Sequence, residues 1–191
     1  MLCDRQIKEL NLIDPFVEGV NEKGKISYGS QPSGYDLRLG NRFLSQAVYM
    51  GWGNQTRELD PRKDLSDEFF EECLEDYAWK HSEGYVLEPG QFILGETVEC
   101  VNLPPTISGE LQTKSTYCRL GISLFTTIIN PGFSGKLTLE IVNLGYRPVL
   151  LVCGQGIAEI QFYRLEEIPD KCYKDKGGKY QDQKGVEIPK S

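Results

Sequence analysis

The chain has 191 residues and a formal net charge of −7, and apolar residues make up 39% of it. This length suits a single globular domain with a sizeable core. The acidic balance argues against general nucleic-acid binding, which draws on a broad basic face. No apolar run approaches the roughly 18 residues that a membrane-spanning helix requires. We therefore expect neither nucleic acid nor a membrane as a partner, and any phosphate site must be local.

The amino-terminal residues MLCDRQIKEL carry charges where a secretory signal would be apolar, which predicts a cytoplasmic protein. In that compartment the six scattered cysteines are expected to be reduced thiols, many of them buried. They are Cys3, Cys73, Cys100, Cys118, Cys153 and Cys172. The single histidine, His81, is expected near a helix end on the surface, and we assign it no role.

The first predicted elements are a helix, a strand and a second helix. The helix covers residues 4–10, with Asp4 able to cap its first turn. In the strand, apolar and charged residues alternate over 35–39, which predicts that one face is buried and the other is not. From Leu65 to Ala78 apolar residues recur at three- and four-residue spacing, which predicts an amphipathic helix with a solvated acidic face.

After Gly84 the sequence changes to short β-like runs separated by Gly or Pro. Strands of this length at intervals of roughly 8–12 residues indicate an all-β barrel or sandwich. We see no second domain, so 1–191 is predicted to be one domain. Its polar, Gly-rich end, 171–191, is either a flexible tail or a lid that becomes ordered over a ligand.

Two segments carry candidate chemistry. Lys114, Ser115, Thr116 and Arg119 place two cations and two hydroxyls close together, a grouping able to bind phosphate oxygens, although similar groupings are common on surfaces. Glu140 interrupts a very apolar strand. It faces either solvent or a pocket, and in a pocket desolvation would raise its pKa and suit it to carry protons near neutral pH.

Several nucleotide and metal motifs are missing from the sequence. Zinc-dependent nucleobase deaminases use an H-x-E segment followed by P-C-x-x-C, and neither occurs here. The sequence also contains no G-x-x-x-x-G-K-[ST] loop and no G-x-G-x-x-G. The sequence therefore lacks the motifs of a zinc-dependent deaminase, of a P-loop nucleotide-binding protein and of a Rossmann dinucleotide-binding protein.

The segments TKSTYCRLGI, NPGFSGKLTLEIVN and GKYQDQKGVEIP together closely resemble the dCTP deaminase branch of the dUTPase-like superfamily. The resemblance extends to LCDRQI, IDPFVEG and ISYGSQPSGYDLRLGNRF, so it covers nearly the whole chain. It implies a mainly β fold, a distorted, jelly-roll-like β-barrel with a few short helices. It also implies a homotrimer with active sites between subunits, and hydrolytic deamination of dCTP to dUTP.

The resemblance also implies a set of site residues. Glu140 would activate the attacking water, while Ser115 and Arg119 would contribute to catalysis and contact phosphate or water. Lys114 and Thr116 would be further phosphate contacts, and a backbone carbonyl near Thr127 or Ile128 would hold the water in line. In the tail, Tyr173, Lys179 and Gln183 would close over the triphosphate. Magnesium would be held on the triphosphate with few or no protein ligands, no zinc would be needed, and dTTP would be a feedback inhibitor.

This sequence departs from the family pattern at two positions. Lys114 stands where many members have arginine, so the planar fork of the guanidinium is lost. Asn130 stands where dUTPases and bifunctional members have an aspartate that activates water for attack on phosphorus, and the preceding loop is about two residues shorter than in some deaminases. We expect deamination without efficient diphosphohydrolysis. The alternatives are a dUTPase or bifunctional enzyme, and a non-catalytic regulator that binds deoxynucleoside triphosphates.

Overall fold

The computed structural model describes residues 1–46, 70–72, 83–125 and 127–190. Strands dominate these residues and form a large curled sheet, so the mainly β prediction is confirmed. The helices are α1 (Asp4–Glu9) and α3 (Ser115–Cys118). The strands are β1 (Ile13–Asp14), β2 (Gly29–Gln31), β3 (Gly34–Gln46), β4 (Phe70–Glu72), β5 (Gly84–Leu87), β6 (Phe92–Asn102), β7 (Ile107–Thr113), β8 (Ile122–Leu124), β9 (Ile128–Ile129), β10 (Ser134–Asn143), β11 (Val149–Val152) and β12 (Gly156–Arg164).

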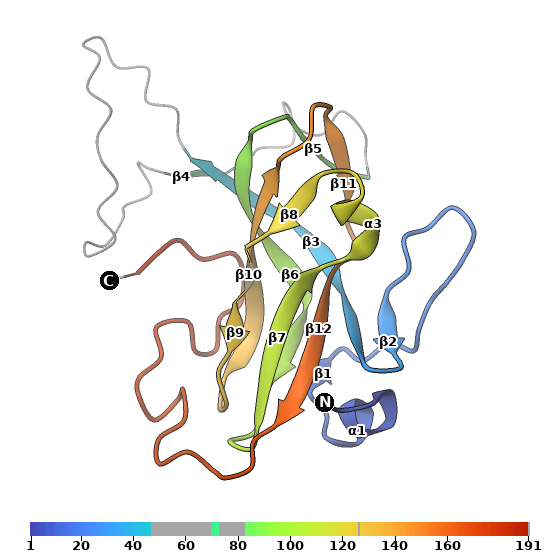
Figure 1. Cartoon of the computed structure of the whole chain (residues 1–191). Helices are drawn as coiled ribbons and strands as arrows, with labels where there is room; N and C mark the ends of the chain where they lie inside the picture. Colours follow the sequence, from blue (N-terminus) through green and yellow to red (C-terminus); the bar gives the residue numbers. More distant parts are fainter. Residues whose placement is uncertain (47–69, 73–82, 126, 191) are drawn as a thin grey trace, which may run out of the picture.

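The large sheet curls because of how its end strands are connected. Its strand order is β8-β10-β6-β3-β12-β7-β9, with β1, β2 and β4 attached to β6 or β3, while β5 and β11 form a separate pair. The two ends of this order, β8 and β9, are separated in the chain by residues 125–127 alone. A link of this length spans only about 13 Å. The sheet must therefore bend until β10 and β7 approach each other, as Figure 1 shows.

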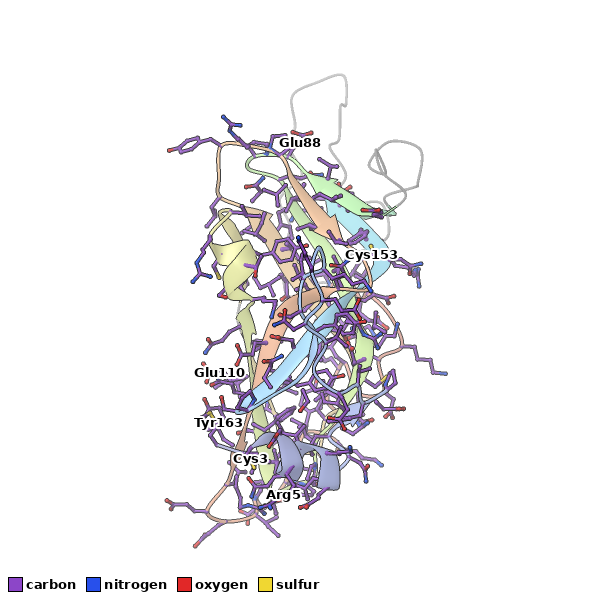
Figure 2. The ribbon with its side chains drawn as sticks, turned by 90° about the vertical axis from the view of Figure 1, so that its right-hand side faces the viewer. Cys3, Arg5, Glu88, Glu110, Cys153 and Tyr163 are labelled. Carbon is purple, nitrogen blue, oxygen red and sulfur yellow. The ribbon has the colours of Figure 1, made fainter. Side chains whose placement is uncertain are left out.

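The core lies inside this curl and is filled by alternate residues of the strands. Leu37, Leu39, Leu139, Ile141 and Ile160 are all fully buried. Figure 2 shows the sheet extending along the molecule, from α1 with Cys3 and Arg5 at one end to the turn with Glu88 at the other. The tail after β12 returns along the outside of β9 and β10 (Figure 1).

The predicted helix over 4–10 is present as α1, but its cap differs from the prediction. The capping residue is Cys3, whose backbone N–H donates to Gln6 Oε1 at 3.1 Å, and Asp4 is the first helical residue. Asp4 still places a negative charge in the first turn, where it interacts favourably with the positive end of the helix dipole.

Two other predictions about local structure need correction. The strand over 35–39 exists within β3, but its charged face is not exposed: Asp36 is buried because Lys114 pairs with it. The helix over 65–78 is wrong at residues 70–72, which form strand β4 against β3, since pairing in the sheet overrides the helical spacing there. The rest of that helix, and His81, lie outside the described residues.

No helix within the described residues is long and apolar enough to cross a membrane. The five cysteines that the structure describes are free: Cys3, Cys100, Cys118, Cys153 and Cys172. The expectation that many are buried is wrong for these five, because each is at least partly exposed. Cys73 lies outside the described residues.

Candidate active site

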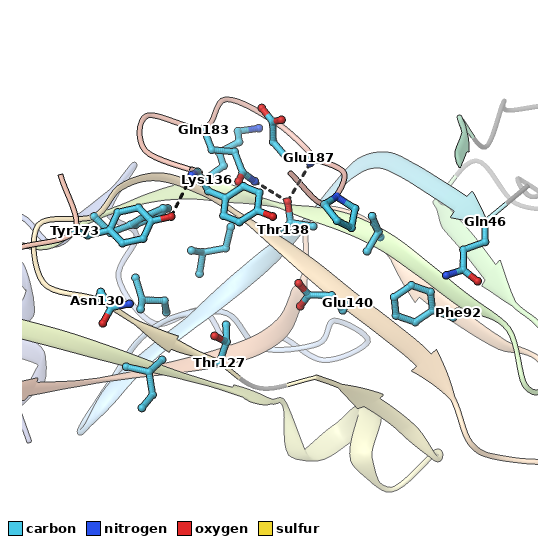
Figure 3. Close-up of a pocket in the computed structure, with 17 residues that line it drawn as sticks. Gln46, Phe92, Thr127, Asn130, Lys136, Thr138, Glu140, Tyr173, Gln183 and Glu187 are labelled. Atoms are coloured by element: carbon cyan, nitrogen blue, oxygen red, sulfur yellow. Dashed lines mark hydrogen bonds between the residues drawn. The ribbon is translucent and has the colours of Figure 1, made fainter. Parts of the chain in front are cut away.

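A cavity of about 590 Å³ opens between β9, β10 and the tail, within the size range of small-molecule sites. Apolar side chains form much of its wall, and polar groups are set among them (Figure 3). The lining residues are Gln46, Phe92, Leu94, Thr127, Ile128, Ile129, Asn130, Phe133, Lys136, Leu137, Thr138, Glu140, Tyr173, Tyr180, Gln183, Glu187 and Pro189.

Strand β10 forms the floor of this pocket. Its side chains alternate, so Leu137, Leu139 and Ile141 enter the core while the intervening polar residues are only partly buried. The polar residues of β10 that line the pocket are Lys136, Thr138 and Glu140. At about 3.3 Å per residue, the strand separates Lys136 from Glu140 by roughly 13 Å. The floor therefore carries an amine, a hydroxyl and a carboxylate in a row.

Glu140 lies against the apolar part of the pocket, near Phe92 (Figure 3). Burial raises the pKa of its carboxyl group above the ordinary value of 4.5, and a hydrogen bond with its own backbone opposes this only in part. Removal from water disfavours the charged form, because the apolar wall cannot solvate it. A carboxyl group with this property can exchange protons at a pH closer to neutrality.

Residues at the start of β9 form the rim beside Glu140. The Phe125 N–H donates to the Glu140 carbonyl at 3.0 Å, and the Leu111 N–H donates to the Thr127 carbonyl at 3.4 Å. Thr127 and Ile128 are exposed and line the pocket. Because a carbonyl oxygen has two lone pairs, Thr127 can still accept a second hydrogen bond. Asn130 lines the same rim.

The tail covers one side of the pocket. Tyr173 packs its ring edge-on against Phe133, with ring centroids 5.7 Å apart, and its hydroxyl accepts from the Tyr180 N–H at 3.1 Å. Gln183 is 7% exposed and lies over β10. The structure thus brings Tyr173 and Gln183 to the same pocket as Glu140. Lys179 does not line it, and its Nζ donates to the Lys190 carbonyl.

The α3 segment lies apart from this pocket. Ser115, Thr116 and Arg119 are exposed, and none of them lines the cavity. Arg119 Nη1 donates to the Ser115 carbonyl at 3.1 Å, so the guanidinium folds back over its own helix. The described chain therefore contains two separate groups of predicted site residues, one around Glu140 and one on α3.

Lys114 has a different environment from the one expected for a phosphate contact. Its side chain is 11% exposed and forms an ion pair with Asp36, whose side chain is 4% exposed. Burial raises the pKa of Asp36, and the lysine acts in the opposite direction. Lys114 N–H also donates to the Ile157 carbonyl at 3.0 Å. This lysine thus anchors the start of α3 to β3 and β12. Its ammonium group is paired with Asp36 and not with a phosphate.

Sequence reasoning missed Lys136 and Thr138. Lys136 Nζ lies 3.3 Å from Glu96 Oε1, and the Glu96 carboxylate is almost fully buried. The signal for both residues was present in the sequence, because they alternate along the strand with the same period as Glu140. The apolar residues around them concealed the fact that this face lines a pocket.

Comparison with known proteins places these features in one family. Residues 6–165 match the dCTP deaminase-like family. The chain is 33% identical to the dCTP deaminase of Pelagibacter ubique, covering 100% of this chain and 98% of that protein. It is 34% identical to the dCTP deaminase of Helicobacter acinonychis, covering 98% and 96%. The structure resembles 2′-deoxycytidine 5′-triphosphate deaminase from Agrobacterium tumefaciens with a TM-score of 0.57 and 25% identity, covering 86% of this chain and 47% of that longer one.

Proposed function

The chain belongs to the dCTP deaminase-like family, and we propose that its pocket converts dCTP to dUTP and ammonia by hydrolysis. The observation that carries the proposal is the position of Glu140. It is a half-buried carboxyl group with a raised pKa, set in an apolar cavity large enough for a pyrimidine nucleotide. Full-length similarity to dCTP deaminases supports the choice of substrate.

The reaction needs one group that moves protons between water and the base. C4 of cytosine becomes electrophilic when N3 is protonated. Glu140 would accept a proton from water as the water oxygen bonds to C4, and would deliver that proton to N3. It would then carry the hydroxyl proton to the 4-amino group, so that the C4–N4 bond breaks and ammonia leaves. The free lone pair of the Thr127 carbonyl is available to hold the water in line.

We propose further that the active site forms between subunits of a homotrimer. Ser115, Thr116 and Arg119 are exposed on α3 and outside the pocket. From there they would reach the nucleotide of a neighbouring copy, where charge-assisted hydrogen bonds would hold the triphosphate. Lys114 would support this from behind by anchoring α3 to Asp36.

The tail would contribute Tyr173, Lys179 and Gln183 to the same triphosphate. Tyr173 already lines the pocket, whereas the exposed Lys179 would have to exchange its Lys190 carbonyl partner for a phosphate oxygen. We propose that segment 171–191 closes as a lid when the nucleotide binds, and that dTTP can occupy the same pocket as a feedback inhibitor. The location would be cytoplasmic, where these nucleotides occur.

We propose magnesium as the ion that accompanies the nucleotide. Within the described residues, no three His, Cys, Asp or Glu side chains lie close enough together to hold a metal ion. The ion would therefore take its ligands from triphosphate oxygens and water. It would neutralise phosphate charge and take no part in the attack at C4. Glu140 would activate the attacking water, and no zinc ion would be needed.

A single residue argues against each of the two alternative functions. A dUTPase or bifunctional enzyme would release pyrophosphate, but Asn130 stands at the pocket rim and its amide cannot accept a proton from water. A non-catalytic regulator would keep the pocket without proton transfer, and Glu140 argues against it.

One experiment separates these three functions. The pure protein is incubated with dCTP, dUTP and dCMP in the presence of magnesium, and the products are resolved by chromatography. We expect dUTP from dCTP, no pyrophosphate, and no loss of activity when a zinc chelator is added. Release of dUMP and pyrophosphate would establish the diphosphatase, and binding without any product would establish the regulator.

A further inference from the structure

Strand β6 carries a bulge beside the pocket floor. On β10, Lys136 and Thr138 are two residues apart, whereas their partners on β6, Cys100 and Glu96, are four residues apart. Strand β6 therefore has two extra residues at this point, and an even number preserves the alternation of its two faces. The bulge slides β10 along β6 by two residues without turning the polar side chains of β10 out of the pocket (Figure 3).

The side chain of Thr97 holds this bulge together. Thr97 is fully buried, and its Oγ1 accepts from the Leu137 N–H at 2.9 Å and donates to the Glu99 carbonyl at 2.7 Å. Glu99 fixes the far end of the bulge, because its buried carboxylate accepts from the Arg38 backbone N–H at 2.9 Å and from Arg38 Nε at 2.6 Å. The bulge is therefore held at both ends by side chains.

The bulge decides which residue stands opposite Glu140. In the structure this residue is Leu94, which is 4% exposed. If the pairing before the bulge continued unchanged, each step forward on β10 would be one step back on β6, and Glu140 would stand opposite Glu96. Directly opposite residues have Cβ atoms about 4.5–5.5 Å apart, and like charges there repel each other. The bulge thus exchanges an acidic neighbour for an apolar one.

Glu96 has a cation of its own in the position where the bulge leaves it. It stands opposite Thr138, and its Oε1 lies 3.3 Å from Lys136 Nζ. The Glu96 side chain is 5% exposed, so this pair is poorly accessible to water. The negative charge that the bulge removes from Glu140 is therefore balanced two residues away along the strand.

Thr97 does not line the pocket, so it can act on the reaction only through the pairing of the strands. We propose that Thr97 is a positioning residue for Glu140: its hydroxyl group holds the bulge that keeps the carboxyl group against Leu94 and away from Glu96. The step from the bulge to catalysis rests on the proposed function, in which Glu140 carries protons. Without the hydroxyl group the two strands separate locally, and water reaches a carboxyl group that the apolar wall otherwise shields.

The inference is tested with Thr97→Val, which keeps the shape of the side chain and removes both hydrogen bonds. We expect kcat to fall about 10-fold or more, because a displacement of about 1 Å can cost 10²-fold in rate, and KM to change less than about twofold. The acid limb of the kcat profile should move to lower pH, toward the ordinary pKa of 4.5, because water stabilises the carboxylate. Thr97→Ser keeps the hydroxyl group and should restore both kcat and the acid limb.

Tyr35→Phe is the matched control, because it removes an equivalent pair of hydrogen bonds outside the pocket. The buried Tyr35 hydroxyl group accepts from the Val17 N–H at 3.0 Å and donates to the Pro15 carbonyl at 3.4 Å. This variant should lower the melting temperature about as much as Thr97→Val and leave the acid limb in place. If Thr97→Val does not fold, Thr97→Ala, which also removes the hydroxyl group, is measured instead.

A readout without substrate separates this inference from the proposed function. The pKa of the Glu140 carboxyl group is measured by NMR titration of protein that contains isotope-labelled glutamate, and Glu140→Gln assigns the signal by removing it. We expect this pKa to be lower in Thr97→Val than in the wild type or in Tyr35→Phe. If the protein does not deaminate dCTP, the proposed function fails, and the titration still decides the role of Thr97. A Glu140 pKa that is unchanged or higher in Thr97→Val would overturn the inference.

Discussion

Strand β10 and the α3 segment both carry residues expected to act on one nucleotide, yet only β10 presents them to the pocket. Lys136, Thr138 and Glu140 line one face of β10, under a tail from the same chain. Ser115 and Arg119 are exposed on a short helix outside the cavity. In the proposed site, the proton-transfer half would thus be built within one chain, whereas the α3 half would be completed only where the surface of α3 meets another subunit.

The largest effect is expected on the β10 side. Glu140→Gln keeps the shape of the side chain but cannot carry protons, so kcat should fall about 10²- to 10⁴-fold. Affinity for dCTP and the melting temperature should change little. A steady-state assay together with nucleotide binding verifies this, and retention of more than about a tenth of wild-type turnover would remove Glu140 from the mechanism.

The α3 side is tested by mixing subunits. Arg119→Ala should lower kcat/KM about 10- to 100-fold, because a charge-assisted contact is lost. When this variant and Glu140→Gln are unfolded together in equal amounts and refolded, roughly a quarter of shared sites should combine an intact Glu140 with an intact Arg119. Activity should therefore return. Mixtures that remain as inactive as the separate variants would contradict a site shared between subunits.

Lys114 sharpens the comparison within the α3 segment, because it is predicted to act on stability. Lys114→Met leaves the buried Asp36 without its partner and should lower the free energy of unfolding by about 3 kcal/mol. The double variant with Asp36→Leu should recover most of this loss. Urea denaturation of the single and double variants measures both values. If Lys114→Met had normal stability but bound dCTP more weakly, Lys114 would be a phosphate contact and not a structural anchor.

The smallest expected effect is the pH dependence that Glu140 imposes. Its pKa is raised in the folded protein above 4.5, so the native state binds more protons than the unfolded state between these two values. The contribution of Glu140 to stability therefore falls as pH rises through that window, while kcat rises as the carboxylate forms. Glu140→Gln should remove this part of the stability profile. A profile that is identical in the two proteins would show that the burial of Glu140 has no energetic consequence.

Local patterns predicted the elements whose own residues determine their structure. The alternation in 134–143 predicts β10, because the residues on one face are apolar enough to enter a core on their own. The short helix near the amino terminus was also predictable, apart from its cap. The helical spacing around residues 70–72 was misleading, because pairing with β3 is a long-range interaction that local periodicity does not contain.

The sequence by itself determined that the chain is mainly β, and its resemblance to a known family implied that Glu140, Tyr173 and Gln183 belong to one site. Only the tertiary structure decided which groups each of them meets. The curl of the sheet turned the polar face of β10 into a pocket, and the pairing of Lys114 with Asp36 converted an expected phosphate contact into an anchor. The reason is physical: burial and hydrogen-bond partners depend on residues far apart in the chain, and these set the pKa of a carboxyl group.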